Sequence, residues 1–203
     1  RYVSDVETRE DGGTPGFLQA FKAALCIRLK EKMGVEKIIL REKELLKIAF
    51  EGLSNVPGLN LLAGNIKERL GVFSFYIEGI HHNLIAKMLN DVFGIQARGG
   101  CSCAGTYGHY LLDVDWETSH DITRHIDHGD FSMKPGWIRI SLHPTMTDAE
   151  LNFIIQSIAD ISINSSKYIN DYQYDSLTNE FIHKNNQADN DAKVHDWFGA
   201  RDL

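Results

Sequence analysis

The chain is organised around residues 97–107, which read Ala-Arg-Gly-Gly-Cys-Ser-Cys-Ala-Gly-Thr-Tyr. Its three glycines allow backbone conformations with positive φ and a close approach to a ligand. Arg98 offers a planar guanidinium suited to a carboxylate or phosphate. Cys101 and Cys103 flank Ser102, and a thiol beside a cationic group ionises more readily. The same pattern is also typical of a glycine turn with a surface arginine and two buried thiols.

A strand is predicted at residues 137–142, which read Trp-Ile-Arg-Ile-Ser-Leu. Ile138, Ile140 and Leu142 alternate with more polar neighbours, as in a strand with one buried face. We therefore expect Arg139 on the face turned away from the core, either lining the same cleft as Arg98 or lying in solvent on an edge strand.

Near the N-terminus, Thr14 and Pro15 predict the start of a helix, with Thr14 as the N-cap and Pro15 in the first helical position. Phe17 and later apolar residues recur every four positions, so we expect a buried helix that ends near Met33. The N–H groups of residues 13–16 would form an anion site. Thr14 either binds such an anion or only caps its helix.

The remaining pattern predicts an α+β order, with helices and strands around a small sheet. We expect helices at 35–56, 83–93 and 107–112, and strands at 59–63, 72–78 and 95–97. A capping box, Thr147 with Glu150, begins another amphipathic helix. The aromatic residues beyond 164 indicate an extension that partly covers the domain.

Residues 113–135 are polar, and we expect a loop there. His120, His125 and His128 lie among aspartates, which is one pattern of a metal site. Their spacing matches no metal motif, so a solvated loop is the preferred interpretation and no metal ligand is assigned.

Composition limits the function. The 203 residues carry 28 acidic and 21 basic side chains, a net charge of −7, which argues against nucleic-acid binding. Three cysteines do not form a disulfide framework and favour a reducing, cytoplasmic location. There is no stretch of about 20 apolar residues, so we expect no membrane helix. The chain begins at Arg1, which suggests a portion of a longer protein.

These motifs resemble the C-terminal region of the class V family of pyridoxal-phosphate enzymes, which includes cysteine desulfurases and selenocysteine lyases. Arg98 matches the arginine, and Cys103 the catalytic cysteine, of the desulfurase loop, while Cys101 and Ser102 stand where that loop has two histidines. Arg139 matches the family arginine that binds the substrate α-carboxylate. Gly13 and Thr14 match the Gly-Thr-Pro whose threonine reaches the cofactor phosphate of the neighbouring subunit.

The resemblance implies the small C-terminal domain of a fold-type I pyridoxal-phosphate transferase, with a short, mostly antiparallel sheet and helices packed on one face. It implies an interdomain segment and helix at 1–33, the small α+β domain at 34–165, and an extension at 166–203. It also implies an amino-acid substrate, pyridoxal 5′-phosphate and a homodimer in the full-length enzyme.

A pyridoxal-phosphate enzyme needs a lysine for the Schiff base and a large domain around it, and neither has a matching motif here. We therefore expect an enzyme in the full-length protein and no catalysis by this segment alone. Desulfuration is slightly preferred to transamination. A stand-alone anion- or metal-binding module is the alternative.

Overall fold

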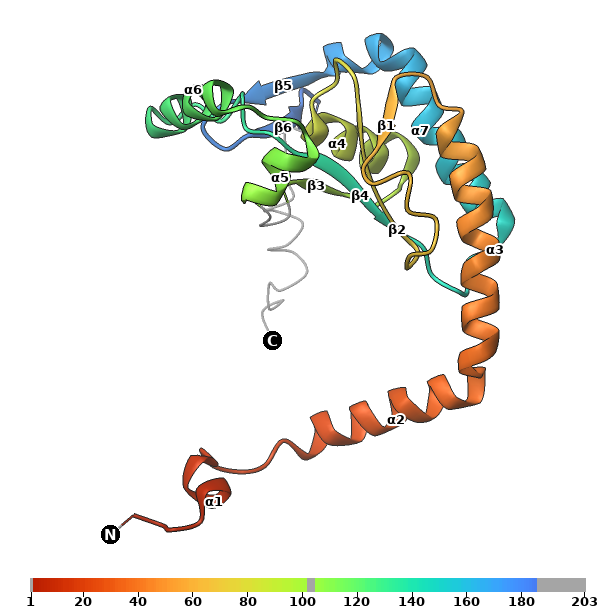
Figure 1. The fold of residues 1–203 in the computed structure, drawn as a ribbon, viewed down its shortest axis with the longest axis vertical. Coiled ribbons are helices and arrows are strands. Elements are labelled where there is room, and N and C mark those ends of the chain that lie inside the picture. Colours follow the sequence, from red (N-terminus) through yellow and green to blue (C-terminus); the bar gives the residue numbers. More distant parts are fainter. Residues whose placement is uncertain (1, 102–104, 186–203) are drawn as a thin grey trace, which may run out of the picture.

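The computed structural model describes residues 2–101 and 105–185. Its central sheet has the order β1-β2-β4-β3, formed by β1 (Leu59–Leu61), β2 (Val72–Ile77), β4 (Trp137–Ser141) and β3 (Arg98–Gly100), and all three neighbouring pairs are antiparallel. Figure 1 shows this sheet in the upper part of the molecule, away from the N-terminus. The strand expected at 95–97 lies later, at 98–100, because the chain leaves α4 through residues 94–97 before it pairs with β4.

Three helices cover one face of the sheet: α3 (Val35–Ser54), α4 (His82–Phe93) and α7 (Asp148–Tyr168). Alternate strand residues point into the same hydrophobic core, among them Phe73, Phe75, Ile138 and Ile140. The predicted capping box begins α7: the Thr147 hydroxyl accepts a hydrogen bond from the Glu150 N–H, and the Glu150 carboxylate accepts one from the Thr147 N–H. The α+β class and the antiparallel sheet are therefore confirmed.

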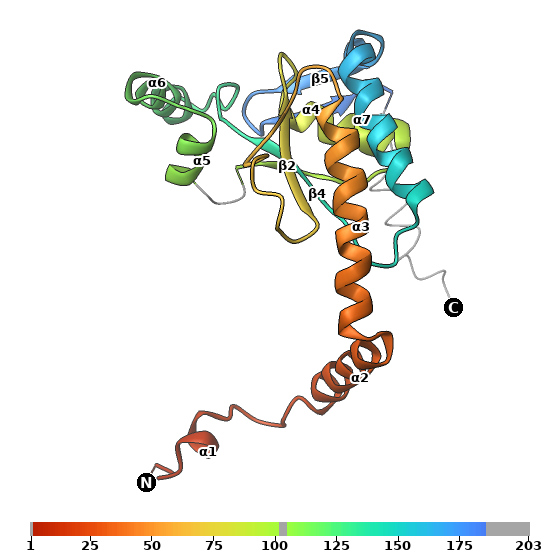
Figure 2. The ribbon, with the colours of Figure 1, turned by 45° about the vertical axis from the view of Figure 1, so that its right-hand side comes forward.

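Two further helices, α5 (Gly105–Leu111) and α6 (Trp116–Asp127), lie on the opposite side of the sheet from α3 and α7 (Figure 2). The prediction of a loop throughout residues 113–135 was wrong, because α6 forms within this segment. The Asp115 carboxylate caps this helix by accepting a hydrogen bond from the Thr118 N–H at 2.7 Å. Most side chains of α6 face solvent and only Ile122 is buried, so its composition is that of a polar segment although its conformation is helical.

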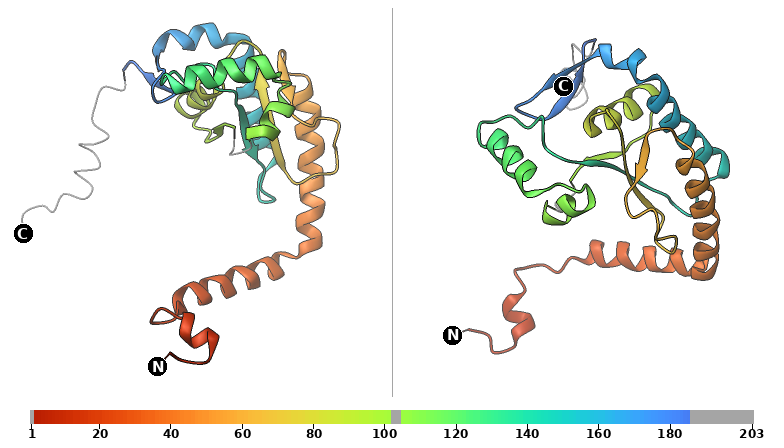
Figure 3. Two further views of the ribbon diagram at one scale, coloured as in Figure 1. Left: turned by 60° about the vertical axis from the view of Figure 1, so that its left-hand side comes forward. Right: turned by 45° about the horizontal axis from the view of Figure 1, so that its top comes forward.

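After α7, a short 3-10 helix, η1 (Ile169–Asp171), leads into a hairpin of β5 (Tyr172–Asp175) and β6 (Glu180–His183). The hairpin packs against the start of α4, as the right-hand view of Figure 3 shows. The Asn83 side chain donates a hydrogen bond to the Asn179 carbonyl at 2.6 Å. The His81 ring lies 5.3 Å from the Phe181 ring.

The N-terminal helices α1 (Val6–Glu10) and α2 (Phe17–Met33) extend away from the sheet (Figures 1 and 2). The expected helix is present, but the prediction that it is buried was wrong, since none of its side chains is buried. Its apolar residues are spread around the helix, and no other described element covers them. Thr14 is not the N-cap, because Gly16 occupies that position.

Gly34 separates α2 from α3 with φ 85°, a conformation that favours glycine. No helix within residues 2–101 and 105–185 is both long enough and apolar enough to cross a bilayer.

Candidate functional site

Two arginines lie opposite each other on the central sheet. In the antiparallel pair β3–β4, Arg98 is the register partner of Arg139. Partners in such a pair point to the same face of the sheet. The neighbours of Arg139 along β4, Ile138 and Ile140, point into the core, so both guanidinium groups belong to the face turned away from it. Arg139 is half-buried and Arg98 is exposed.

The arrangement favours an anion. Like charges directly opposite each other on neighbouring strands repel. Within the described chain, neither Arg98 nor Arg139 forms an ion pair with an acidic side chain. A carboxylate or phosphate that binds both guanidinium groups would relieve this repulsion and accept charge-assisted hydrogen bonds.

The backbone that carries Arg98 is fixed by close packing. A Cβ atom on Gly99 would come within 2.6 Å of the Asn83 Oδ1 atom on α4. Glycine therefore lets α4 approach this strand. Gly100, with φ 116°, follows directly and takes a conformation that side-chain-bearing residues avoid. Gly99 and Gly100 thus lie on the strand that pairs Arg98 with Arg139.

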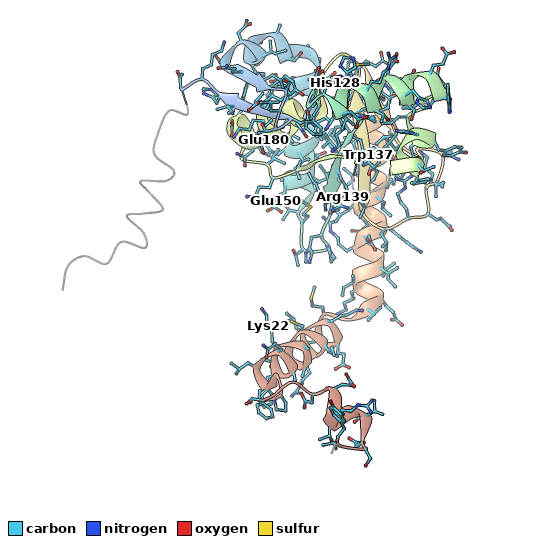
Figure 4. All side chains as sticks on the ribbon, turned by 90° about the vertical axis from the view of Figure 1, so that its left-hand side faces the viewer. Lys22, His128, Trp137, Arg139, Glu150 and Glu180 are labelled. Atoms are coloured by element: carbon cyan, nitrogen blue, oxygen red, sulfur yellow. The ribbon has the colours of Figure 1, made fainter. Side chains whose placement is uncertain are left out.

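Next to the arginines, the outward face of β4 carries Trp137. This side chain is 4% exposed but does not belong to the main hydrophobic core. Helix α5 covers it: a Cβ atom on Gly108 would lie 3.3 Å from the indole ring. Figure 4 shows Trp137 and Arg139 on the same strand. This wall was not expected from the sequence, because α6 lies within residues 113–135, where a loop was predicted.

Other expected site residues lie elsewhere. Gly13 and Thr14 are exposed and precede α2, and this segment is remote from the sheet in all views of Figures 1 to 3. The structure therefore does not bring them to the arginine pair within one chain. Cys103 lies outside the described residues. Cys101 is half-buried beside α5.

The pyridoxal phosphate implied by the resemblance can be tested against the open face of the sheet. By register, its outward side chains include Asn60, Ser74, Tyr76, Arg139 and Arg98, and no lysine occurs among the strand residues. Lys22 lies on α2, far from Arg139 (Figure 4). The face fits a carboxylate but does not fit the Schiff-base attachment of the cofactor.

The histidines of the α6 region make local contacts. The His120 ring packs on Trp116 at 4.0 Å. His125 Nδ1 lies 3.2 Å from the Asp130 carboxylate, and His128 Nδ1 lies 2.7 Å from the Arg124 carbonyl. No group of three or more metal-ligating side chains forms within the described ranges.

A second histidine feature was not expected from the sequence. His81 and His82 stack with ring centroids 4.2 Å apart at the start of α4, and His81 Nδ1 accepts the Asn83 N–H as the helix cap. Burial, with smaller effects of His81 and Lys134, lowers the pKa of His82 to about 4. His82 is therefore neutral near pH 7 and serves as a packing residue.

Comparison with known proteins supports one family. The family model described as aminotransferase class-V matches residues 2–154. Probable cysteine desulfurases of Staphylococcus aureus strain Mu50 and Staphylococcus epidermidis strain ATCC 12228 are 32% and 33% identical over 101 residues. These matches cover 50% of this chain and 24% of each relative, so the matched part spans about a quarter of the relatives' length.

Among solved structures, the apo cysteine desulfurase of Thermococcus onnurineus NA1 superimposes with a TM-score of 0.55 and 25% identity, over 76% of this chain and 33% of that protein. The family match covers well over half of the chain. The chain therefore belongs to the class V aminotransferase family, in a region similar to cysteine desulfurases, and has the α+β fold of the small domain of a fold-type I pyridoxal-phosphate enzyme.

Proposed function

We propose that this chain forms the part of a class V enzyme that binds the α-carboxylate of an amino-acid substrate, in an enzyme that resembles cysteine desulfurases and selenocysteine lyases more than aminotransferases. The register pair of Arg98 and Arg139 carries this proposal. The probable desulfurases among its relatives support the desulfurase branch.

Arg139 is the principal carboxylate ligand in this proposal. Its half-buried position on β4 limits the motion of its guanidinium, and a planar fork binds a carboxylate through two parallel hydrogen bonds. Arg98, from the neighbouring strand, adds positive charge and helps orient the carboxylate. Together they would hold the reacting carbon of the substrate in a fixed position, which is the main contribution of such residues to the rate.

The lysine and the remaining cofactor contacts come, in this proposal, from a large domain that accompanies this chain in the whole enzyme. The relatives are about four times as long as the matched part. Gly13 and Thr14 are exposed in a segment remote from the arginines, which suits a contact with the cofactor phosphate of a second subunit. When bound, pyridoxal phosphate would supply the electron sink for the chemistry at the substrate α-carbon.

The test measures by NMR titration whether ligand binding to this chain depends on the carboxylate of the ligand. L-alanine carries the α-carboxylate, and L-alaninamide is the matched probe that lacks it. We expect alanine to bind more tightly and Arg139→Gln to weaken alanine binding by about tenfold or more, since a hydrogen bond between charged groups contributes about 1.5–3 kcal/mol. Arg28→Gln, at an exposed position on α2, is the control and should leave binding unchanged.

Equal affinity for alanine and alaninamide would refute the proposal. Inorganic phosphate is the second probe. If it bound at Arg98 and Arg139 while alanine did not, a stand-alone anion-binding module would be the better description.

A further inference from the structure

A groove of about 890 Å³ lies between α3 and the connection from β1 to β2. We call it the α3 groove, and it is lined by side chains within residues 43–55 and 67–69. Helix α3 covers the core face of the sheet, whereas Arg98 and Arg139 belong to the opposite face. The α3 groove is therefore separate from the arginine pair.

The α3 groove gathers positive charge, although the whole chain has a net charge of −7. Two carboxylates line it, together with four cations: Lys43, Lys47, Lys67 and Arg69. Within residues 2–101 and 105–185, none of these cations forms an ion pair. Lys43 and Lys47 are four positions apart on one helix, where like charges destabilise. An anionic partner would relieve this repulsion.

The outer wall of the groove is fixed against α3. The Glu42 carboxylate accepts a hydrogen bond from the Gly71 N–H at 2.7 Å, and the connection from β1 to β2 lies beside α3 in Figure 2. The Arg69 guanidinium donates hydrogen bonds to the Ile66 carbonyl at 2.8 Å and to the Ala63 carbonyl. These contacts hold the wall in place, so its cations are positioned before a partner binds.

An aromatic ring forms the floor of the groove. Phe50 is 9% exposed, and Lys67 Nζ lies 4.0 Å from the centre of its ring. The guanidinium carbon of Arg69 lies 5.4 Å from the same centre. Cations at these distances are attracted to the ring. An apolar group that reaches Phe50 would replace the lysine on the ring, and the ammonium group could then bind a carboxylate.

The length of the groove favours a peptide over a small anion. Residues 43–55 extend for about 18 Å, at 1.5 Å per helical residue. This equals about five residues of extended chain at about 3.4 Å each. A phosphate ion would fill only a small part of that length and would leave most of the cations unpaired.

We propose that the α3 groove binds an acidic segment of a partner protein, about five residues long, in which carboxylates flank one apolar or aromatic side chain. The carboxylates pair with Lys47 and Lys67, and the apolar side chain contacts Phe50. The proposal does not depend on the proposed function, because the groove shares no residue with the arginine pair.

The experiment measures the binding of synthetic, end-capped pentapeptides to the full chain by NMR titration. The probe is Glu-Glu-Phe-Glu-Glu. Two matched peptides, Gln-Gln-Phe-Gln-Gln and Glu-Glu-Gly-Glu-Glu, lack the charges and the apolar group respectively. We expect the probe to bind at least about fivefold more tightly than either, and to bind more weakly at high ionic strength. Equal affinity for the probe and either matched peptide would overturn the proposal.

Charge variants test the location. The double variant Lys47→Gln with Lys67→Gln, at exposed positions, should weaken binding of the probe about three- to tenfold, because two exposed ion pairs are lost. Lys22→Gln with Lys30→Gln removes the same charge from exposed positions on α2 and should leave the affinity unchanged. An equal effect of the two double variants would refute the location.

A steric variant gives a second test. Ser54→Trp places a bulky side chain at an exposed position in the groove and should block the probe. Ile163→Trp, at a site on α7 that is 65% exposed, is the control and should bind the probe as the parent chain does. Unchanged binding in Ser54→Trp would contradict the proposed site.

Two further outcomes would overturn the proposal in favour of another ligand or place. If Arg139→Gln weakened binding of the probe while the Lys47 and Lys67 variant did not, the peptide would bind at the arginine pair. If inorganic phosphate displaced the probe and bound as tightly, the groove would be a site for small anions and not for a peptide.

Discussion

Arg98 and Arg139 face each other as register partners across β3 and β4, on the face of the sheet turned away from the core. Two cations at directly opposed positions repel, and within the described part of the chain no acidic side chain pairs with either. Such a pair lowers the stability of the unliganded protein and favours an anionic ligand. The same relationship therefore bears on both stability and binding.

Removing one charge of this pair should stabilise the chain. We expect Arg98→Gln to raise the free energy of unfolding by about 0.2–1 kcal/mol at low ionic strength, because the cross-strand repulsion is lost. The gain should shrink in high salt, which screens exposed charges. Urea unfolding at two salt concentrations measures it, with Arg28→Gln as the reference for loss of an isolated surface charge. A lower stability of Arg98→Gln than of Arg28→Gln would contradict the repulsion.

The close contact between Gly136 and His82 predicts a destabilising substitution. A Cβ atom at position 136 would lie 2.6–2.8 Å from three atoms of the His82 ring, and that ring stacks on His81. Gly136→Ala should therefore lower the free energy of unfolding by about 1–3 kcal/mol, as overpacking does. Gly12→Ala is the matched control, since no atom lies within 4 Å of its Cβ position. Equal urea midpoints for the two variants would show that the ring moves freely.

The buried His82 predicts loss of stability in weak acid. Its pKa is about 4 in the folded chain and about 6.5 when unfolded. Between these values the unfolded chain binds more protons, so lowering the pH favours unfolding. We expect a loss of about 2 kcal/mol between pH 7 and pH 5. Burial also lowers the pKa of His81, which acts in the same direction.

Urea unfolding at several pH values measures this effect, with His82→Gln as the comparison. The variant lacks the titrating ring and should lose less stability on acidification than the parent chain. A parent chain whose stability does not change from pH 7 to pH 5 would contradict the assignment of His82 as a buried neutral base.

The sequence predicted the elements that carry a strong periodic signal. Alternation in residues 72–78 and 137–142 located two strands and their inward faces, and the spacing of apolar residues located α3 and α4. The Thr147 capping box was also predicted, because the two residues involved are only three positions apart. Local signals of this kind need no knowledge of the tertiary fold.

The errors concern features that depend on what lies next to an element. The apolar residues of α2 predicted burial, but they are spread around the helix, and no described element covers them. The wall around Trp137 was missed because α6 buries only Ile122 and otherwise has a polar surface. The sequence could predict only that Arg98 and Arg139 share a face. Their direct pairing is set by the whole sheet, because β3 and β4 are distant along the chain.

Thr147 and Thr14 were both predicted to cap helices, and together they give a matched test of capping. Thr147→Ala should lower the free energy of unfolding by about 1 kcal/mol, because it removes the hydroxyl that accepts the Glu150 N–H. Thr14→Ala should leave stability unchanged, because Gly16 and not Thr14 occupies the N-cap of α2. A comparable loss in both variants would mean that Thr14 has a structural role. With stability unchanged, an effect of Thr14→Ala on cofactor affinity in the whole enzyme would support the proposed phosphate contact.

The last prediction concerns the two loop thiols in the whole enzyme. In a desulfurase, L-cysteine and a cysteine thiol of the protein give L-alanine and a protein persulfide, so the substrate sulfur moves to the protein and no external oxidant is needed. The nucleophile must be a thiolate near cationic groups. We propose Cys103, which lies outside the described residues, as this nucleophile because of its resemblance to the desulfurase loop, whereas Cys101 lines the pocket between β4, α5 and α6.

We therefore expect Cys103→Ala to abolish persulfide formation from L-cysteine, measured by mass spectrometry of the intact protein together with alanine release. Cys101→Ala should still form the persulfide. Cys26→Ala, at an exposed site on α2, should behave as the parent. Undiminished persulfide in Cys103→Ala would exclude that thiol as the acceptor. Absence of persulfide in the parent enzyme, with amino transfer to a keto acid instead, would assign the protein to the aminotransferase branch.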